Sequence, residues 1–337
     1  MKALEHGGRL DAAIAKYGGT PKQWLDLSTG INPRGYLVGE VHPDAWSRLP
    51  DAARWNAAID AQRMACDVPQ QAGVSLAPGT QMHIQMLPTL FKPQPVAVVG
   101  YTYQEHGHCW RRAGHNVLVS DGLESAKATA RIIVVVNPNN PDGRIYDPDE
   151  LVALGRSLAS KGGLLVVDES FGDVAPDISV APQTGADGLI VLRSLGKFYG
   201  LAGVRFGAAI GSPGLAEKLD EALGPWAVSG PALDLAARAL ADRTWRTRMR
   251  RKLKADRQDL DTILVEHGLK ILGGTDLFVL IENTQAKAFA EHLAEQRILV
   301  RQFSAKPDWV RMGLPGSLPA LKRLGKALVG APGASAT

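Results

Sequence analysis

The stretch LRSLGKFYGLAGVRFG, residues 192–207, places Lys197 in a setting that is otherwise apolar and rich in glycine. Ser194 precedes this lysine by three residues, and Arg205 follows it by eight. Burial in such a setting lowers the pKa of a lysine and favours its neutral, nucleophilic amine. A hydroxyl and a guanidinium nearby can hold a phosphate, the guanidinium through two parallel hydrogen bonds. The stretch therefore predicts a lysine that forms a Schiff base with a phosphorylated aldehyde cofactor, although most lysines are solvated surface residues.

The composition is that of a globular chain with ample material for a core. The chain has 337 residues, of which 45% are hydrophobic and 21% are charged, and its formal net charge is +4. Its two cysteines, Cys66 and Cys109, do not form a CxxC pair, which is typical of a reduced, cytoplasmic protein. The N-terminus lacks the apolar segment of a signal peptide, and no apolar run reaches the roughly 18 residues of a membrane span. We therefore expect a cytoplasmic protein with no membrane partner and no metal site.

Much of the positive charge lies in one run, RTWRTRMRRKLKADR at residues 243–257. Such a run indicates either a nucleic-acid-binding patch or the solvated face of a long helix. It lacks regularly interleaved aromatic residues, and acidic residues dilute it on both sides. The helix face is the favoured interpretation, so no nucleic-acid partner is expected.

Short β-rich runs alternate with helical patterns through the middle of the chain. The predicted strands are residues 96–100, 117–120, 132–136, 164–167, 189–192 and 206–210. Helical patterns lie between them at residues 81–90, 104–113 and 148–161. Several of the strands are apolar throughout, as expected where helices cover both faces of a sheet. The alternation predicts an α/β fold with a mostly parallel, doubly wound central sheet.

After residue 225 the pattern becomes that of a smaller α+β unit. Residues 231–266 predict one long helix or a helix pair, and later segments predict strands at 277–282, 298–301 and 309–312 with helices at 285–296 and 318–328. The first 28 residues contain a short amphipathic helix that we expect to pack with this unit. The predicted division is a large domain at 29–225, a small domain at 1–28 and 226–330, and a tail at 331–337.

Polar residues follow two of the apolar strands at the point where each strand ends. The segment VNPNNPDG, residues 136–143, contains two X-Pro steps that end a strand sharply. Its asparagines can direct amides at a ligand over the strand end, although an ordinary Asn/Pro turn has a similar sequence. Asp168 follows the apolar strand at 164–167 and is poorly solvated there unless a cation, such as a protonated pyridine nitrogen, lies beside it. The alternative is that Asp168 caps the next helix.

Two further segments are weak signals individually. The segment LAPGTQ, residues 76–81, leads into an apolar helix, where a glycine followed by a hydroxyl residue can bind an anion or serve as a plain N-cap. After the strand at 96–100, Tyr103 could stack on a planar ring and His106 could hydrogen-bond Asp168, although a lone tyrosine or histidine is more often a core or surface residue. Their order is informative, because these segments occur at successive strand ends.

In that order of motifs the chain resembles the fold-type-I pyridoxal-phosphate enzymes, the aspartate aminotransferase superfamily. HGG at residues 6–8, INP at 31–33, PWAVS at 225–229 and RILVR at 297–301 are similar to the threonine-phosphate decarboxylases of cobalamin biosynthesis, which make (R)-1-amino-2-propanol phosphate. Histidinol-phosphate aminotransferases share the fold and cofactor residues but typically have tyrosine where this chain has Phe171. The resemblance implies pyridoxal 5′-phosphate as cofactor and decarboxylation of L-threonine O-3-phosphate, with transamination of a phosphorylated substrate such as histidinol phosphate as the alternative. A third possibility is a catalytically silent protein that keeps the fold.

The resemblance also implies individual roles. Lys197 matches the Schiff-base lysine, and Asp168 matches the partner of the pyridine nitrogen. Asn140 matches the donor to the phenolic oxygen, and Tyr103 matches the stacking ring. The remaining implied cofactor-binding residues, mostly at the phosphate, are Gly79, Thr80, Gln81, Ser194 and Arg205. For the substrate, the implied carboxylate ligand is Arg311, and the candidates for the phosphate and its surroundings are His6, Asn32 and Arg301.

Three residues depart from the family pattern. Asp142 stands where the pattern has threonine, and we expect it to affect the turn more than the chemistry. Leu49 replaces a tyrosine that relatives offer to the cofactor phosphate of the partner subunit. Phe171 removes a hydroxyl from the phenolic oxygen and leaves Asn140 as its main donor. The resemblance still implies a homodimer with a small phosphorylated amino-acid substrate, but these residues alone do not decide between decarboxylation and transamination.

Overall fold

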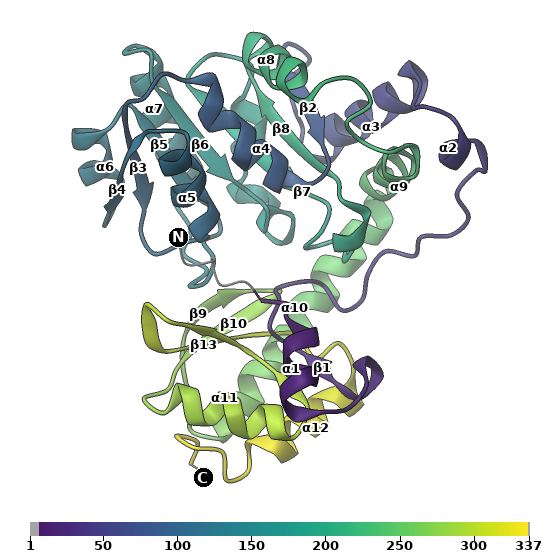
Figure 1. Ribbon diagram of the computed structural model, residues 1–337, viewed down its shortest axis with the longest axis vertical. Helices are drawn as coiled ribbons and strands as arrows, with labels where there is room; N and C mark the ends of the chain where they lie inside the picture. Colours follow the sequence, from purple (N-terminus) through teal and green to yellow (C-terminus); the bar gives the residue numbers. More distant parts are fainter. Residues whose placement is uncertain (1–6, 336–337) are drawn as a thin grey trace. The chain divides into compact units, whose positions relative to one another are not determined.

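The computed structural model describes residues 7–335 and forms two compact units (Figure 1). The large unit consists of Tyr36–Asn140 and Arg144–Arg246. The small unit contains the described residues before Tyr36, Pro141–Gly143, and the described residues from Thr247 onward. These units are defined by spatial contacts, and the division into domains at residues 29 and 226 stays a prediction.

The central sheet of the large unit is mostly parallel, as predicted. Its described strands, in spatial order, are β2 (Gly73–Ala77), β8 (Gly207–Gly211), β7 (Leu189–Ser194), β6 (Leu164–Asp168), β5 (Ile132–Val136), β3 (Pro95–Val99) and β4 (Asn116–Ser120). β8 runs antiparallel to both of its neighbours, whereas the other adjacent pairs are parallel. β2 is absent from the predicted strands, because its sequence GVSLA lacks a continuous apolar run.

Helices cover the sheet of the large unit (Figure 1). The helices of this unit include α2 (Asp44–Ser47), α3 (Ala52–Ala65), α4 (Thr80–Met86), α5 (Gln104–Arg112), α6 (Leu123–Thr129), α7 (Pro148–Ala159), α8 (Pro213–Leu223) and α9 (Gly230–Ala241). β5 and β6 are buried at every position, as expected for strands with helices on both faces. The apolar faces of α4 and α5 join the core through Ile84, Cys109 and Trp110. The strongly apolar predicted strands are therefore the ones at the centre of the core.

The small unit is built on an antiparallel sheet whose described strands, in order, are β12 (Arg301–Phe303), β13 (Lys306–Gly313), β10 (Phe278–Glu282) and β9 (Lys270–Thr275). A separate parallel pair joins β1 (Leu25–Asp26) to β11 (Ile298–Leu299). The strand predicted at residues 298–301 is therefore wrong as one element, because β11 and β12 pair with partners in different sheets. β9 is absent from the predicted strands, since its sequence KILGGT includes two glycines. The helices of this unit include α1 (Leu10–Tyr17), α11 (Ala286–Glu295) and α12 (Leu318–Leu328).

The basic run lies on α10 (Arg243–Glu266), which follows α9 and confirms the predicted helix pair. Trp245, Met249 and Leu253 are buried on one face of this helix. Some of these basic side chains make contacts within the protein. Arg246 is buried and donates from Nη1 to the backbone carbonyl of Ala65 at 2.8 Å. Lys252 pairs with Asp256 one turn later, at 2.7 Å. The described part of the chain contains no helix that is both long enough and apolar enough to span a membrane.

Candidate active site

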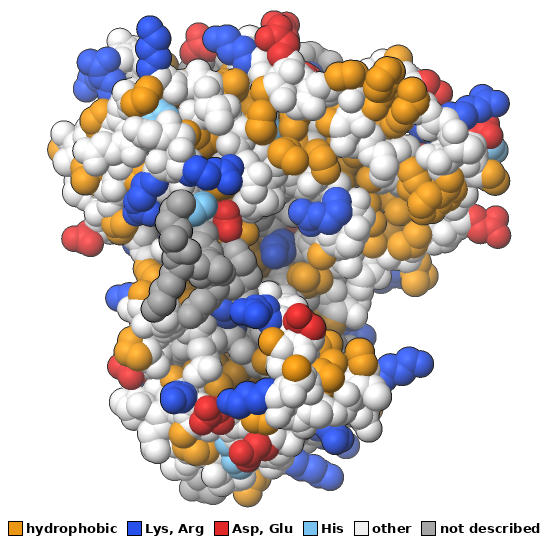
Figure 2. Space-filling view, in the orientation of Figure 1, with side chains coloured by type: hydrophobic (Ala, Val, Ile, Leu, Met, Phe, Trp, Pro, Cys, Tyr) orange, Lys and Arg blue, Asp and Glu red, His pale blue; other side chains and the backbone are white. Residues whose placement is uncertain are grey.

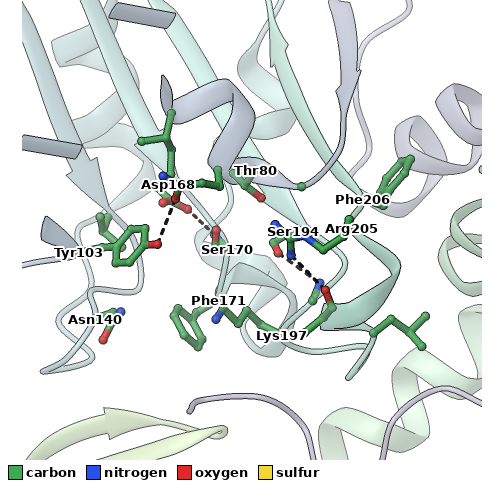
Figure 3. Close-up of a pocket in the computed structure, with 17 residues that line it drawn as sticks. Thr80, Tyr103, Asn140, Asp168, Ser170, Phe171, Ser194, Lys197, Arg205 and Phe206 are labelled. Carbon is green, nitrogen blue, oxygen red and sulfur yellow. Dashed lines mark hydrogen bonds between the residues drawn. The ribbon is translucent and has the colours of Figure 1, made fainter. Parts of the chain in front are cut away.

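The sheet topology gathers the predicted ligand residues of the large unit at one edge. β2, β3, β5, β6 and β7 run in one direction, so their carboxyl ends meet there. β8 runs the other way, so the residues just before it arrive at the same edge. A cavity at this edge is lined by Gly79, Thr80, Gln81, Tyr103, Asn140, Asp168, Ser194, Lys197 and Arg205, together with Ser170 and Phe171 (Figure 3). Every predicted cofactor residue thus lines one cavity, although their individual roles stay predictions.

Asp168, the last residue of β6, is held as a buried anion. His106 Nε2 lies 2.8 Å from Asp168 Oδ2, which confirms the predicted contact. The backbone N–H of Ser170 donates to Oδ1 at 2.9 Å. Burial acts to raise the pKa of Asp168, but the hydrogen bonds and charge of His106 and the hydrogen bonds of Ser170 outweigh it and hold that pKa below its ordinary value. The site therefore presents a negative charge to whatever lies over the end of β6.

The opposite end of the cavity is suited to an anion. Gly79 has a φ of 84° and leads into α4, and a Cβ at this position would lie 2.9 Å from the guanidinium carbon of Arg205. Only glycine therefore lets Arg205 lie against this turn. Thr80 donates its hydroxyl to the carbonyl of Arg193 at 3.1 Å, and Ser194 lies at the end of the same strand. The turn, the two hydroxyl side chains and the guanidinium match the donor set that phosphate prefers.

Lys197 lies in the turn between β7 and β8, and its side chain reaches toward Phe171 (Figure 3). Lys197 Nζ is 5.5 Å from the centre of the Phe171 ring, which is itself buried. The two residues after the lysine anchor the turn. Tyr199 stacks on Trp245 with ring centres 5.6 Å apart, and Phe198 meets Trp245 edge to face at 5.4 Å. The sequence reasoning missed this anchor, because Trp245 lies almost 50 residues further along the chain.

A buried ion-pair network lies directly behind the cavity. Arg193 Nη1 is 2.7 Å from Glu169 Oε2, and Arg193 Nη2 is 2.7 Å from Asp173 Oδ1. All three side chains are buried. Arg193 is the residue before Ser194, and Glu169 is the residue after Asp168, so the network ties the ends of β6 and β7 together. The sequence analysis assigned no role to Arg193. The signal it could have used is that Arg193 and Glu169 each adjoin a predicted cofactor residue, Ser194 and Asp168.

In the small unit, Arg301 and Arg311 are direct cross-strand partners on β12 and β13. Arg311 is buried, donates from Nη2 to the carbonyl of Ser28 at 2.9 Å, and lies 5.2 Å from the centre of the Phe278 ring. Burial, together with the charge of Arg301, lowers the pKa of Arg311 to about 10. Like charges directly opposite each other destabilise a sheet. An anion bound beside this pair would relieve the repulsion.

The other two predicted substrate residues are less well defined by the structure. Asn32 is buried, and its side-chain oxygen accepts the backbone N–H of Arg34 at 2.7 Å. His6 lies outside the described residues. Within residues 7–335, no cluster of three or more His, Cys, Asp or Glu side chains could hold a metal ion.

The large unit has a lysine, a buried carboxylate and an anion-binding turn at one edge of a mostly parallel sheet, which defines an α/β enzyme with a strand-end site for a phosphorylated planar ligand. The family model for aminotransferase class I and II matches residues 61–328. The chain therefore belongs to that family, and the predicted family and fold are confirmed.

Individual relatives agree with the family assignment. A threonine-phosphate decarboxylase of Sinorhizobium sp is 42% identical over 329 residues, covering 96% of this chain and 97% of the relative. A threonine-phosphate decarboxylase of Pseudomonas aeruginosa is 41% identical over 329 residues, covering 97% of this chain and 98% of the relative. The solved structure of histidinol-phosphate aminotransferase from Sinorhizobium meliloti, in complex with pyridoxal-5′-phosphate, has a TM-score of 0.84 at 20% identity and covers 98% of each chain. This last similarity concerns the fold alone.

Proposed function

We propose that this chain is a pyridoxal-phosphate-dependent threonine-phosphate decarboxylase that converts L-threonine O-3-phosphate to (R)-1-amino-2-propanol O-2-phosphate in cobalamin biosynthesis. The observation that carries this proposal is the similarity, over nearly the full chain, to two relatives of that name. The site supports it independently, because the large unit has the groups that the cofactor needs and the small unit has two guanidinium groups for a substrate with two anionic groups.

The residues that line the cavity fit pyridoxal phosphate. Its ring nitrogen carries a proton that needs an anion, and Asp168 is held in its charged form. Its phosphate needs donors, and Gly79, Thr80, Ser194 and Arg205 line the other end of the cavity. When bound, the cofactor supplies a protonated ring that accepts the electron pair left by a broken bond at the substrate α-carbon.

The chain's own residues supply the remaining steps. The amine of Lys197 would hold the cofactor aldehyde and would also serve to move a proton at the substrate α-carbon. Asp168 would keep the proton on the ring nitrogen, and Tyr103 would cover the ring. Asn140 would be the donor to the phenolic oxygen, since Phe171 has no hydroxyl. Each assignment is testable by substitution at that position.

The substrate's two anionic groups would be held by the small unit. Arg311 is assigned to the carboxylate, and Arg301 to the phosphate with its surroundings, which include His6 and Asn32. Decarboxylation would require that the arginines orient the substrate so that the bond to its carboxylate breaks, whereas transamination would require that the bond to its α-hydrogen breaks.

We extend the proposal to a cytoplasmic homodimer. Large apolar side chains are exposed on the large unit, among them Trp46, Leu49 and Trp226 at 71%, 64% and 56%. Hydrophobic side chains gather over the region of α2 and α9 (Figure 2). Patches of this kind on a folded protein support association with another surface. Light scattering of the purified protein would measure the mass, and a monomer at micromolar concentration would contradict the dimer.

The decisive experiment is incubation of the purified holoenzyme with L-threonine O-3-phosphate. The proposal predicts release of CO2 and formation of the amino-propanol phosphate without any keto acid. Absence of CO2 release, combined with amino transfer from histidinol phosphate that depends on a keto acid, would establish the aminotransferase instead. A wild-type protein that develops no visible absorbance with pyridoxal phosphate would indicate a catalytically silent member of the family.

A further inference from the structure

A chain of hydrogen bonds ends on the ring of Tyr103. Tyr103 Oη donates to Gln81 Oε1 at 3.1 Å, and Gln81 Nε2 donates to Glu105 Oε2 at 2.9 Å. Gln81 lies in the first turn of α4, directly after Thr80, whereas Tyr103 is the N-cap residue of α5 and Glu105 lies in its first turn. The hydroxyl of the predicted stacking ring is thus connected to the helix that follows the predicted phosphate turn.

The carboxylate of Glu105 decides which way the amide of Gln81 points. A carboxylate only accepts hydrogen bonds, so the amide must turn its NH2 group toward Glu105. Its carbonyl oxygen then faces Tyr103 and can accept the phenolic hydroxyl. Cys109, one turn further along α5, also donates to Glu105, from Sγ at 3.7 Å. The acceptor oxygen of Glu105 therefore turns the carbonyl of Gln81 toward Tyr103.

The ring of Tyr103 is held at a second point. It meets His106 edge to face, with ring centres 6.1 Å apart and planes at 86°. His106 in turn bonds Asp168. Burial, with the charges of Glu105 and Asp168, raises the pKa of Tyr103, so the hydroxyl keeps its proton and remains a donor. With His106 against the ring and Gln81 at its hydroxyl, Tyr103 is held at two points at the wall of the cavity.

We propose that Gln81 and Glu105 are positioning residues that set the plane of the Tyr103 ring for stacking on the cofactor. The inference rests on the proposed function, because it needs a planar ring in the cavity. Gln81 then acts on the cofactor through Tyr103. Glu105, which does not line the cavity, contributes to cofactor affinity only through Gln81.

A charge-swap experiment tests this chain. Gln81→Glu places two carboxylates against each other and should weaken pyridoxal-phosphate binding about tenfold, measured by titration of the apoprotein. Glu105→Gln keeps an acceptor oxygen for the Gln81 amide and should change affinity less than about threefold. The double variant Gln81→Glu/Glu105→Gln restores one donor and one carboxylate in exchanged positions, and should recover wild-type affinity within about threefold.

The double variant separates positioning from simple repulsion of the cofactor phosphate. A carboxylate at position 81 is present in both the single and the double variant, so loss of affinity by repulsion would persist in the double variant. Persistent loss would overturn the proposal, as would an unchanged affinity in Gln81→Glu. Melting temperatures of the apoproteins identify a variant that binds weakly only because it is unfolded.

A second comparison asks whether Gln81 acts through Tyr103. Gln81→Met should lower cofactor affinity about fivefold in the wild-type background and have little effect in the Tyr103→Phe background, where no hydroxyl needs an acceptor. Equal losses in both backgrounds would show that Gln81 acts on the cofactor directly and would overturn the proposal. A wild-type protein that binds no pyridoxal phosphate would reject the proposed function and this inference together, whereas normal wild-type binding with a failed charge swap rejects the inference alone.

Discussion

The large unit places the buried carboxylates around its cavity against basic side chains, whereas the small unit sets two like charges side by side. Around the cavity, Asp168 lies against His106, and Arg193 lies between Glu169 and Asp173. In the small unit, Arg301 and Arg311 face each other across two antiparallel strands. Charges that are balanced within the protein stabilise and orient the site before any ligand arrives. Two positive charges that face each other repel, and a bound anion would relieve that repulsion. The two units therefore differ in how their charged side chains are arranged.

The first prediction concerns Lys197, which lines the cavity of the large unit. Lys197→Ala should lower the rate of CO2 release by at least about a thousandfold, because it removes the proposed nucleophile and the proposed proton-transfer group. Product formation and the visible spectrum of the protein with pyridoxal phosphate would be measured together. An unchanged circular dichroism spectrum would show that the fold survives. Activity within tenfold of wild type would mean that another residue performs both tasks.

The second prediction tests whether the paired charges stabilise the large unit. Arg193→Met should lower the free energy of unfolding by about 3–5 kcal/mol, because it leaves two carboxylates buried without their cation. Urea unfolding of the apoprotein would measure the loss. The matched control adds Glu169→Gln and Asp173→Asn to the same variant and should recover part of it. If the single variant unfolds like wild type, the network contributes nothing to stability.

The third prediction concerns how the stability that Asp168 and His106 contribute depends on pH. The pKa of Asp168 is lower in the folded protein than its ordinary value, so this pair contributes stability that is present above about pH 4 and is lost as the pH falls through the folded pKa. His106→Phe should cost about 1–3 kcal/mol near neutral pH, and this loss should shrink as the pH falls, because burial then raises the pKa of Asp168 and protonation of the carboxyl favours the folded variant. Melting curves of the apoprotein from pH 3 to 7, roughly the range that the linkage covers, would test this. Parallel curves for variant and wild type, offset by a constant, would contradict the assigned pKa shift.

The smallest effect is expected in the small unit and has the opposite sign. Arg301→Gln removes one of two facing positive charges, so the protein without ligand should gain about 0.5 kcal/mol of stability. The same variant should raise the KM for L-threonine O-3-phosphate about tenfold or more, because a charge-assisted contact to the substrate is lost. Unfolding in phosphate-free buffer and steady-state kinetics would be compared. Loss of stability together with an unchanged KM would show that Arg301 is structural.

Local pattern was sufficient for much of the fold and for the cavity. The runs at 132–136 and 164–167 are recognisable as buried strands because every residue in them is apolar. Parallel strands bring their carboxyl ends to one edge, so Asn140 and Asp168 had to be neighbours once those strands were paired in parallel. β2 and β9 were not predicted, because their sequences contain glycine or mix polar and apolar residues and so lack a continuous apolar run.

The sequence by itself determined which residue types stand at the strand ends, since strand order along the chain and the apolar runs are local properties. Only the tertiary structure decided how side chains from distant segments pair. The contact of Arg193 with Glu169, the chain from Tyr103 through Gln81 to Glu105, and the register that sets Arg301 opposite Arg311 all depend on packing. A shift of one residue in that register would turn one guanidinium to the other face of the sheet, and no local pattern in either strand determines it.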